Sequence, residues 1–180
     1  MDENEKTREF EAIAMPHLDA AYNLARWLTR NDHQAEDLVQ EAFLRAFRFF
    51  DGFRGMGGGG ARAWLLTIVR NTYFTSLREQ RHEHVPFDEE LLGAESGEGG
   101  MPVAQAAGPE EQMMARDTQR EVNRALEKLP PAFREVIVLK EMNDLSYKEI
   151  ADIAGVPLGT VMSRLARARK MLGEILKGGR

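Results

Sequence analysis

Hydrophobic side chains recur at helical spacing along most of the first 85 residues. Residues 10–30, 34–50 and 62–81 each show this pattern, which predicts amphipathic helices with one buried face. The second stretch is apolar on more than one side, so it either lies deep in a core or also meets a partner. Its polar stripe consists of Asp37, Glu41, Arg45 and Arg48. No alternating strand pattern is present in the sequence, and we therefore predict an all-α fold.

The last 70 residues contain further helical patterns. Residues 113–128 and 132–141 each predict a helix, and Pro130 and Pro131 suit the first turn of the second one. Residues 145–172 then predict a helix-turn-helix. Ser146 can cap its short first helix, which Gly155 and Pro157 end, and Thr160 can cap the longer second helix.

The second helix of this motif has two different faces. Its buried stripe consists of Val161, Leu165, Ala168 and Leu172. The opposite face carries Ser163, Ala166, Arg167 and Lys170, flanked by Met162, Arg164 and Arg169. A short scaffold helix followed by a basic second helix can place side chains in the major groove of DNA.

Residues 86–111 differ from both helical parts. They are rich in Gly, Ala, Pro and Glu, and large apolar side chains almost vanish after Leu92. Such a segment buries too little surface to offset its ordering entropy. We therefore predict two small helical domains, residues 1–85 and 112–180, joined by a flexible acidic linker at residues 86–111. We expect the halves to fold separately and to reorient freely.

Charge is unevenly distributed along the chain. The net charge is −5, yet from Arg164 onward there are six basic side chains and one acidic side chain, Glu174. Residues 86–116 instead hold seven acidic side chains and one basic side chain. A basic patch on an acidic protein favours neutralisation of nucleic-acid phosphates. The alternative is a helical hairpin whose basic face is simply solvated.

The composition excludes several classes of function. The chain has no cysteine, which rules out disulfides and thiolate metal sites and fits a reducing compartment. It has neither the apolar run of a signal peptide nor a membrane-spanning stretch, so we expect a cytoplasmic protein. The glycines at 57–60 lack a nucleotide-binding ending, and His82 and His84 lack further ligands. We find no nucleophile–base group, and we expect no catalysis, metal or cofactor.

The aromatic residues of the third helical stretch allow two interpretations. Trp64, Tyr73 and Phe74 lie among several arginines. They can belong to the core, or they can form a surface on which the bases of a single strand stack. Their spacing leaves both interpretations open.

Ordered motifs in both halves resemble a known family. The motifs Asp37-Leu-Val-Gln-Glu-Ala-Phe43, Phe53-Arg-Gly55 and Trp64-Leu-Leu-Thr-Ile-Val-Arg-Asn71 resemble the conserved core region of bacterial RNA polymerase sigma factors. Leu129-Pro-Pro-Ala-Phe-Arg-Glu135 and Gly159-Thr-Val-Met-Ser-Arg-Leu165 resemble the promoter-binding region of the same proteins. The whole is similar to the extracytoplasmic-function (ECF) group, and the resemblance covers nearly all of the chain outside the linker.

The resemblance implies roles for particular residues. The second helix would bind core polymerase through Asp37, Gln40, Glu41, Arg45 and Arg48. The loop at 51–61 and the helix after it would melt and hold the −10 element through Arg54, Arg62, Arg70, Asn71 and Arg78. The last helix would read the −35 element through Thr160, Met162, Ser163, Arg164, Ala166, Arg167 and Lys170. Arginine suits the paired acceptors of guanine, and a small alanine lets a base approach.

Two positions depart from the family pattern. Met162 stands where many relatives carry lysine or arginine, so one contact to DNA is absent. The glycines at 57–60 replace polar residues in the loop that would hold the flipped −10 base.

The resemblance also implies partners and a function. These partners are core RNA polymerase, promoter DNA and an anti-sigma factor, often membrane-anchored, with no small-molecule substrate. The implied function is to start transcription of stress- or signal-responsive genes. One alternative is a sigma mimic that sequesters an anti-sigma factor, which need not keep Asn71, Arg164, Arg167 or the polar stripe of the second helix. Another is a helix-turn-helix repressor with a helical sensor domain.

Overall fold

The computed structural model describes residues 2–55, 60–83 and 109–178, and within these residues every regular element is a helix. This confirms the predicted all-α fold. The elements of the first half are α1 (Glu3–Ala14), the short turn η1 (Met15–His17), α2 (Leu18–Thr29), α3 (Asp32–Arg48), α4 (Phe50–Gly55) and α5 (Ala61–Glu83). The elements of the second half are α6 (Pro109–Glu127), α7 (Pro131–Ile137), the π-helical turn η3 (Val138–Met142), α8 (Tyr147–Ala154) and α9 (Leu158–Gly178).

The first helical stretch is two helices, and its prediction as a single helix is wrong. Pro16 lies in the η1 turn between α1 and α2. Proline has no N–H to donate and its ring clashes with the preceding turn, so the regular hydrogen-bond ladder stops there. The predicted loop after α3 is also shorter than expected, because α4 occupies its first part. Residues 56–59, which include most of the glycine run, lie outside the described residues.

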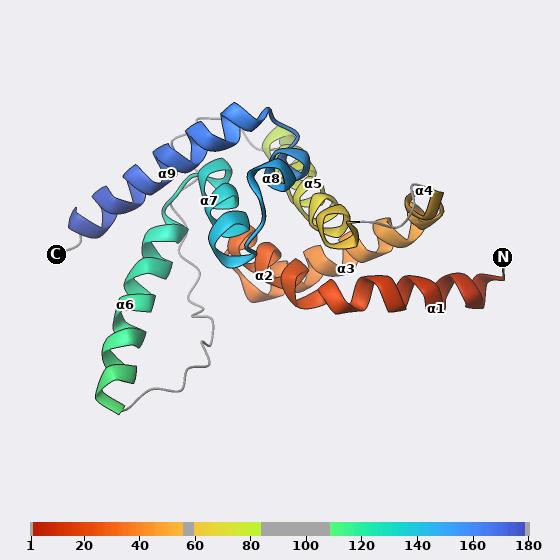
Figure 1. Cartoon of the computed structure of the whole chain (residues 1–180), viewed down its shortest axis with the longest axis horizontal. Coiled ribbons are helices and arrows are strands. Elements are labelled where there is room, and N and C mark those ends of the chain that lie inside the picture. Colours follow the sequence, from red (N-terminus) through yellow and green to blue (C-terminus); the bar gives the residue numbers. More distant parts are fainter. Residues whose placement is uncertain (1, 56–59, 84–108, 179–180) are drawn as a thin grey trace.

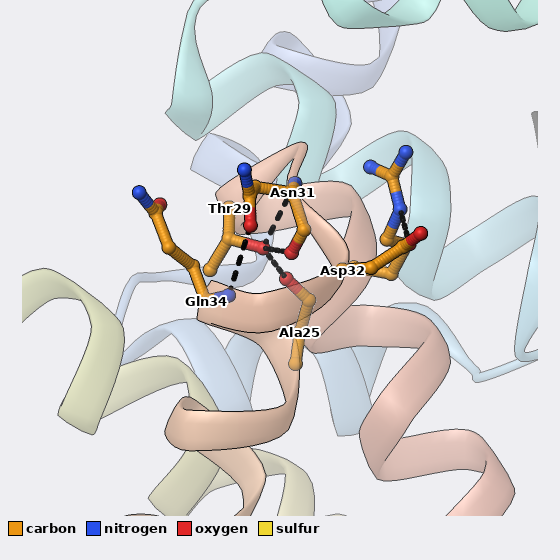
Figure 2. Close-up of polar contacts among 6 residues, drawn as sticks. Ala25, Thr29, Asn31, Asp32 and Gln34 are labelled. Atoms are coloured by element: carbon orange, nitrogen blue, oxygen red, sulfur yellow. Dashed lines mark hydrogen bonds and ion pairs between the residues drawn. The ribbon is translucent and has the colours of Figure 1, made fainter. Parts of the chain in front are cut away.

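A dense set of local hydrogen bonds makes the corner between α2 and α3 (Figure 2). Arg30 ends α2 in the left-handed conformation, with φ 59°. The Asn31 side chain then accepts the Gln34 N–H at 3.0 Å and caps α3. The Thr29 hydroxyl donates to the Ala25 carbonyl at 2.8 Å, and Arg26 Nε lies 2.7 Å from Asp32 Oδ1. This corner fixes the direction in which α3 leaves α2.

The helix-turn-helix forms as the sequence predicts, apart from one cap. Ser146 and Glu149 make a reciprocal capping box at the start of α8, and Gly155 ends it with φ 67°. The predicted cap at Thr160 is wrong, because α9 begins two residues earlier, at Leu158. The Pro157 carbonyl instead accepts the N–H groups of Thr160 and Val161.

Two apolar clusters hold the described residues together. The smaller one is aromatic: Phe10 of α1 meets the rings of Phe43, Phe47 and Phe50 edge to face, and Phe53 stacks on Trp64. The larger cluster draws buried side chains from both halves of the chain. Its members include Leu24, Leu28, Leu66, Val69, Val136, Leu139, Ile150 and Leu165.

The two halves therefore share one apolar core in this structure. Helix α5 lies against α8, and α2 lies against α7 (Figure 1). We expected halves that fold apart and reorient freely, and this closed arrangement differs from that expectation. The limits 1–85, 86–111 and 112–180 stay a prediction. Residues 86–108 of the predicted linker lie outside the described residues, and α6 begins at Pro109.

Candidate functional site

The outer face of α9 is exposed and basic. Five of the side chains predicted to read DNA are exposed there: Met162, Ser163, Ala166, Arg167 and Lys170. Thr160 and Arg164 are half-buried. The stripe of Val161, Leu165 and Ala168 is buried beneath this face, which fixes the rotation of the helix about its axis. The polar and basic side chains therefore project toward solvent.

The start of α9 also exposes apolar side chains. Met162 is 53% exposed, and Leu158, one turn earlier, is also exposed. Sequence reasoning placed Met162 in the candidate site but missed Leu158, since it started the helix at Thr160. Apolar side chains at the N-terminal end of such a helix suit contact with a thymine methyl group.

The polar stripe of α3 lies on the surface. Asp37, Gln40, Glu41 and Arg48 are exposed, and Arg45 is half-buried with its guanidinium 3.0 Å from Glu41 Oε1. A groove of about 670 Å³ runs beside the stripe and is lined in part by Asp37, Glu41 and Arg45. The candidate core-binding residues thus form one continuous surface.

Two large apolar side chains accompany this stripe. Leu44 is 62% exposed and Phe49 is 65% exposed. The apolar residues on more than one side of this helix were evident in the sequence, but Leu44 was not among the predicted site residues. Its signal was positional: Leu44 lies four residues from both Gln40 and Arg48, on the face that they define. Exposed apolar groups edged by charge are typical of a protein-binding surface.

Helix α5 presents the candidate −10 residues on different sides. Asn71 and Arg78 are exposed, whereas Arg62 and Arg70 are half-buried toward the second half of the chain. The Arg54 side chain is not among those that the structure describes. These residues therefore do not form one free surface in the closed arrangement.

Arg70 has partners on several sides. Its Nε lies 2.7 Å from Glu135 Oε1 of α7, and its guanidinium lies over the Phe74 ring, 4.3 Å from the centroid. Its Nη1 also donates to Asn71 Oδ1 at 3.3 Å. Sequence reasoning treated Arg70 as free to bind DNA, because nothing in the local pattern indicates a partner 65 positions away.

Glu135 is a fully buried carboxylate. Burial raises its pKa above the ordinary value, and the positive charges of Arg70 and, to a smaller extent, Arg164 oppose that rise. Its second oxygen, Oε2, is buried without a hydrogen-bond partner. A buried ion pair of this kind specifies an arrangement but adds little net stability, because desolvation offsets the attraction.

The neighbouring Arg134 joins the two halves through backbone carbonyls. It is 1% exposed and donates to the carbonyls of Leu129 at 2.8 Å, Leu28 at 3.1 Å and Glu127 at 3.3 Å. Burial lowers its pKa to about 10, and the nearby Tyr73 hydroxyl partly counters that effect. Arg30 also donates to the Glu127 carbonyl at 3.1 Å.

The aromatic residues of α5 pack against their own protein. Trp64 stacks on Phe53 with ring centroids 4.2 Å apart, and Tyr73 packs edge to face on Phe74 at 5.1 Å. Burial raises the pKa of Tyr73, even though Arg134 acts in the opposite direction. These contacts favour the core interpretation of Trp64 and Tyr73 over a base-stacking surface.

Other site types find no support in the described part of the chain. No group of three or more metal-ligating side chains occurs there. No helix among residues 2–55, 60–83 and 109–178 is both long enough and apolar enough to cross a bilayer. His84 lies outside the described residues.

Comparisons with known proteins match both halves. Residues 13–83 match the family described as Sigma-70 region 2, and residues 119–172 match Sigma-70, region 4. The ECF RNA polymerase sigma-E factor of Escherichia coli K12 is 38% identical over 136 residues, covering 76% of this chain and 70% of that protein. The ECF RNA polymerase sigma factor SigE of Mycolicibacterium smegmatis is 34% identical over 172 residues, covering 93% of this chain. This chain spans 61% of the length of that SigE.

Solved structures share the fold over nearly the whole chain. The sigma factor RpoE of Bartonella quintana, in complex with the anti-sigma factor NepR, superposes with a TM-score of 0.72 at 30% identity. The match covers 96% of this chain and 99% of that one. CnrH, in complex with the cytosolic domain of CnrY, has a TM-score of 0.62 over 97% of this chain; at 24% identity this likeness concerns the fold alone.

Proposed function

This chain belongs to the ECF group of RNA polymerase sigma factors, and from this premise we propose that it is an alternative sigma factor. It binds core polymerase, recognises −35 and −10 promoter elements and starts transcription of a signal-responsive set of genes. It does so by binding alone, without an enzymatic activity of its own, and in the cytoplasm. The observation that carries the proposal is the α8–α9 helix-turn-helix with an exposed basic face, in the same chain as an exposed charged and apolar α3 surface.

Recognition of the −35 element is assigned to α9. Arg167 and Lys170 are exposed on its outer face, and Ser163 and Ala166 leave room for base edges between them. Arginine donates two hydrogen bonds to guanine, and lysine contributes phosphate attraction that weakens as salt rises. Arg164, half-buried beside Glu135, supports the face from its edge.

Recognition of the −10 element is assigned to α5. Asn71 offers both a donor and an acceptor to an unpaired base, and Arg62, Arg70 and Arg78 supply positive charge for the strand. Arg54 completes the assigned set. Trp64 and Tyr73 hold α5 in place from within rather than stack on bases, given their packing against Phe53 and Phe74.

Binding of core polymerase is assigned to the α3 surface. Charged and polar side chains there, Asp37, Gln40, Glu41, Arg45 and Arg48, surround the exposed Leu44 and Phe49. The apolar pair supplies contact area, and the charges set the orientation of the partner. An anti-sigma factor is the proposed inhibitory partner, by analogy with the RpoE–NepR complex.

A run-off transcription assay with purified core polymerase tests this function. The template library carries randomised −35 and −10 elements, so no promoter needs to be known beforehand. A sigma factor yields transcripts from a subset of templates that shares both elements. A sigma mimic yields none and fails to bind the templates, whereas a repressor binds DNA without core polymerase and yields no transcript. Either of those results would refute the proposal.

A further inference from the structure

The beginning of α9 carries no charged side chain. Residues 158–163 are neither acidic nor basic, whereas four basic residues follow within the next seven positions: Arg164, Arg167, Arg169 and Lys170. When a recognition helix enters the major groove, its N-terminal residues contact the edges of bases. The side chains of α9 that are best placed to reach bases are therefore uncharged.

Two large apolar side chains are exposed at this end of the helix. Leu158 is 48% exposed and Met162 is 53% exposed, although Val161 and Leu165 of the same helix are buried. Leu158 and Met162 are four residues apart, so they are neighbours on the helix surface. Ala166, four residues farther along, is exposed and continues the row. An apolar ridge thus runs along the part of α9 that would meet the bases.

The arginine that follows the ridge on the same flank is already paired. Arg169 lies seven residues after Met162, which is about two helical turns and brings it to the same side of α9. Its Nη2 lies 3.0 Å from Glu141 Oε1. A guanine beside Met162 would have to compete with this carboxylate for the donors of Arg169. The ridge is therefore the main feature that this flank offers to a base.

The methyl group of thymine is the part of a base that an apolar ridge can recognise. Thymine presents its C5 methyl group in the major groove, whereas guanine, cytosine and adenine present polar groups there. An apolar side chain pressed against those polar groups would remove them from water without giving them a hydrogen-bond partner. The ridge therefore selects thymine both by contact with the methyl group and by exclusion of the other bases.

We propose that Leu158 and Met162 form a thymine-reading pair, which specifies an A·T base pair where the start of α9 meets the −35 element. The proposal rests on the function proposed above and names the base that this part of the helix selects. Arg167 and Lys170, farther along α9, supply the charge that holds the duplex, and the apolar pair adds a choice of base. Methionine at position 162 thus changes which base is read, rather than only removing a contact.

Substitution of uracil for thymine tests the proposal, because uracil differs from thymine only by the missing methyl group. Duplexes with a randomised −35 element are first selected by binding to core polymerase loaded with the full chain. The best duplex is then made with deoxyuridine at one thymine at a time. At one thymine, or at two adjacent ones, uracil should weaken binding about fourfold, as expected for the loss of one buried methyl group. Uracil at the other thymines should leave binding unchanged.

Variants of the protein connect that methyl group to the two side chains. Met162→Ala and Leu158→Ala should bind the thymine and uracil duplexes almost equally, because the apolar partner of the methyl group is lost. Met162→Arg, taken through the same selection, should prefer guanine at that position. Met113→Ala truncates another exposed methionine, on α6, and should keep the fourfold difference.

The possible results separate this base contact from its alternatives. Binding by the parent protein that no uracil substitution weakens overturns the proposal, as does an undiminished fourfold difference in both alanine variants. Loss of core polymerase binding by both variants, with folding established by circular dichroism, would also overturn it, because the apolar pair would then serve a protein partner. The uracil comparison itself needs no variant.

The selection is also carried out with the full chain alone, which makes the methyl test independent of the polymerase. Methyl-dependent binding without any transcript in the run-off assay would count against the sigma-factor function alone. Transcripts that are insensitive to every methyl group of the −35 element would instead overturn only the thymine-reading pair.

Discussion

The Arg134 guanidinium donates to the Leu28 carbonyl at 3.1 Å, across 106 positions of the chain. Leu28 lies in the last turn of α2, where backbone carbonyls have no partner within the helix. The same side chain satisfies the Leu129 and Glu127 carbonyls near the end of α6. One buried cation thus connects a helix end of the first half with the turn that leads into α7.

Replacing Arg134 should destabilise the protein strongly. Arg134→Ala leaves the Leu28 and Leu129 carbonyls short of a donor and creates a cavity, while Arg30 still donates to the Glu127 carbonyl. The expected loss is about 2–4 kcal/mol in the free energy of unfolding. Urea unfolding followed by circular dichroism measures this loss. Arg134→Lys retains the charge but not the planar fork, so it should recover only part of the stability. Full recovery of stability by lysine would mean that the charge of this residue, rather than its hydrogen bonds, stabilises the protein.

Arginines of α9 should contribute separately to −35 recognition. Arg164→Ala and Arg167→Ala should each weaken binding of the −35 duplex by about 1–3 kcal/mol while core polymerase binding stays intact. The measurement is promoter binding by the polymerase complex at matched salt. Arg169→Ala is the control, since Arg169 is held 3.0 Å from Glu141 and lies beside the proposed reading face. Parent-like promoter binding by both test variants would refute the assignment of this face.

Reversing a charge on the α3 surface should abolish binding of core polymerase. Glu41→Arg breaks the pair with Arg45, which is worth only about 0.2–0.5 kcal/mol to the helix, so the variant should fold. A pull-down of core polymerase should nevertheless fail, and Leu44→Ser should weaken it through lost apolar contact. Asp19→Arg reverses an exposed charge on α2 and should retain binding. Normal pull-down by folded Glu41→Arg would place the core-binding surface elsewhere.

Acidification should favour the parent protein over a Glu135→Gln variant. Burial raises the pKa of Glu135 despite Arg70 and Arg164, so the folded state holds this proton to higher pH than the unfolded state does. The stability from this group is fully present below its unfolded pKa and is lost as pH rises through the folded pKa. The free energy of unfolding of the parent relative to Glu135→Gln should therefore increase from about pH 7 down to pH 4.5. Urea titrations across that range measure it, and the opposite slope would mean that pairing with Arg70 outweighs burial.

Local sequence signals account for most of what could be predicted. Ser146 directly precedes the short helix α8, so its role as a cap was predictable, and the stripe of Val161, Leu165 and Ala168 fixes the orientation of α9. The break at Pro16 was also a local signal, but the apolar periodicity across it favoured one continuous helix. The cap of α9 was misplaced because threonine is a good cap, whereas here the Pro157 carbonyl starts the hydrogen bonding.

Local sequence signals could not predict contacts between residues that lie far apart in the chain. Arg70 and Glu135 are separated by 65 positions, and each looks like an ordinary polar residue on its own helix. Periodicity indicates which face of a helix is buried but not which other helix covers it. The sequence therefore predicted neither the core that the two halves share nor the half-burial of Arg62 and Arg164.

The shared apolar core links opening of this protein to its lifetime. Side chains of α2 and α5 are covered by α7 and α8, so an opened molecule that has found no partner exposes apolar surface that proteases and quality-control chaperones recognise. Contact between the halves keeps this apolar surface buried, and a partner bound to the opened molecule would cover the same surface. A weaker interface between the halves would thus shorten the half-life of the protein.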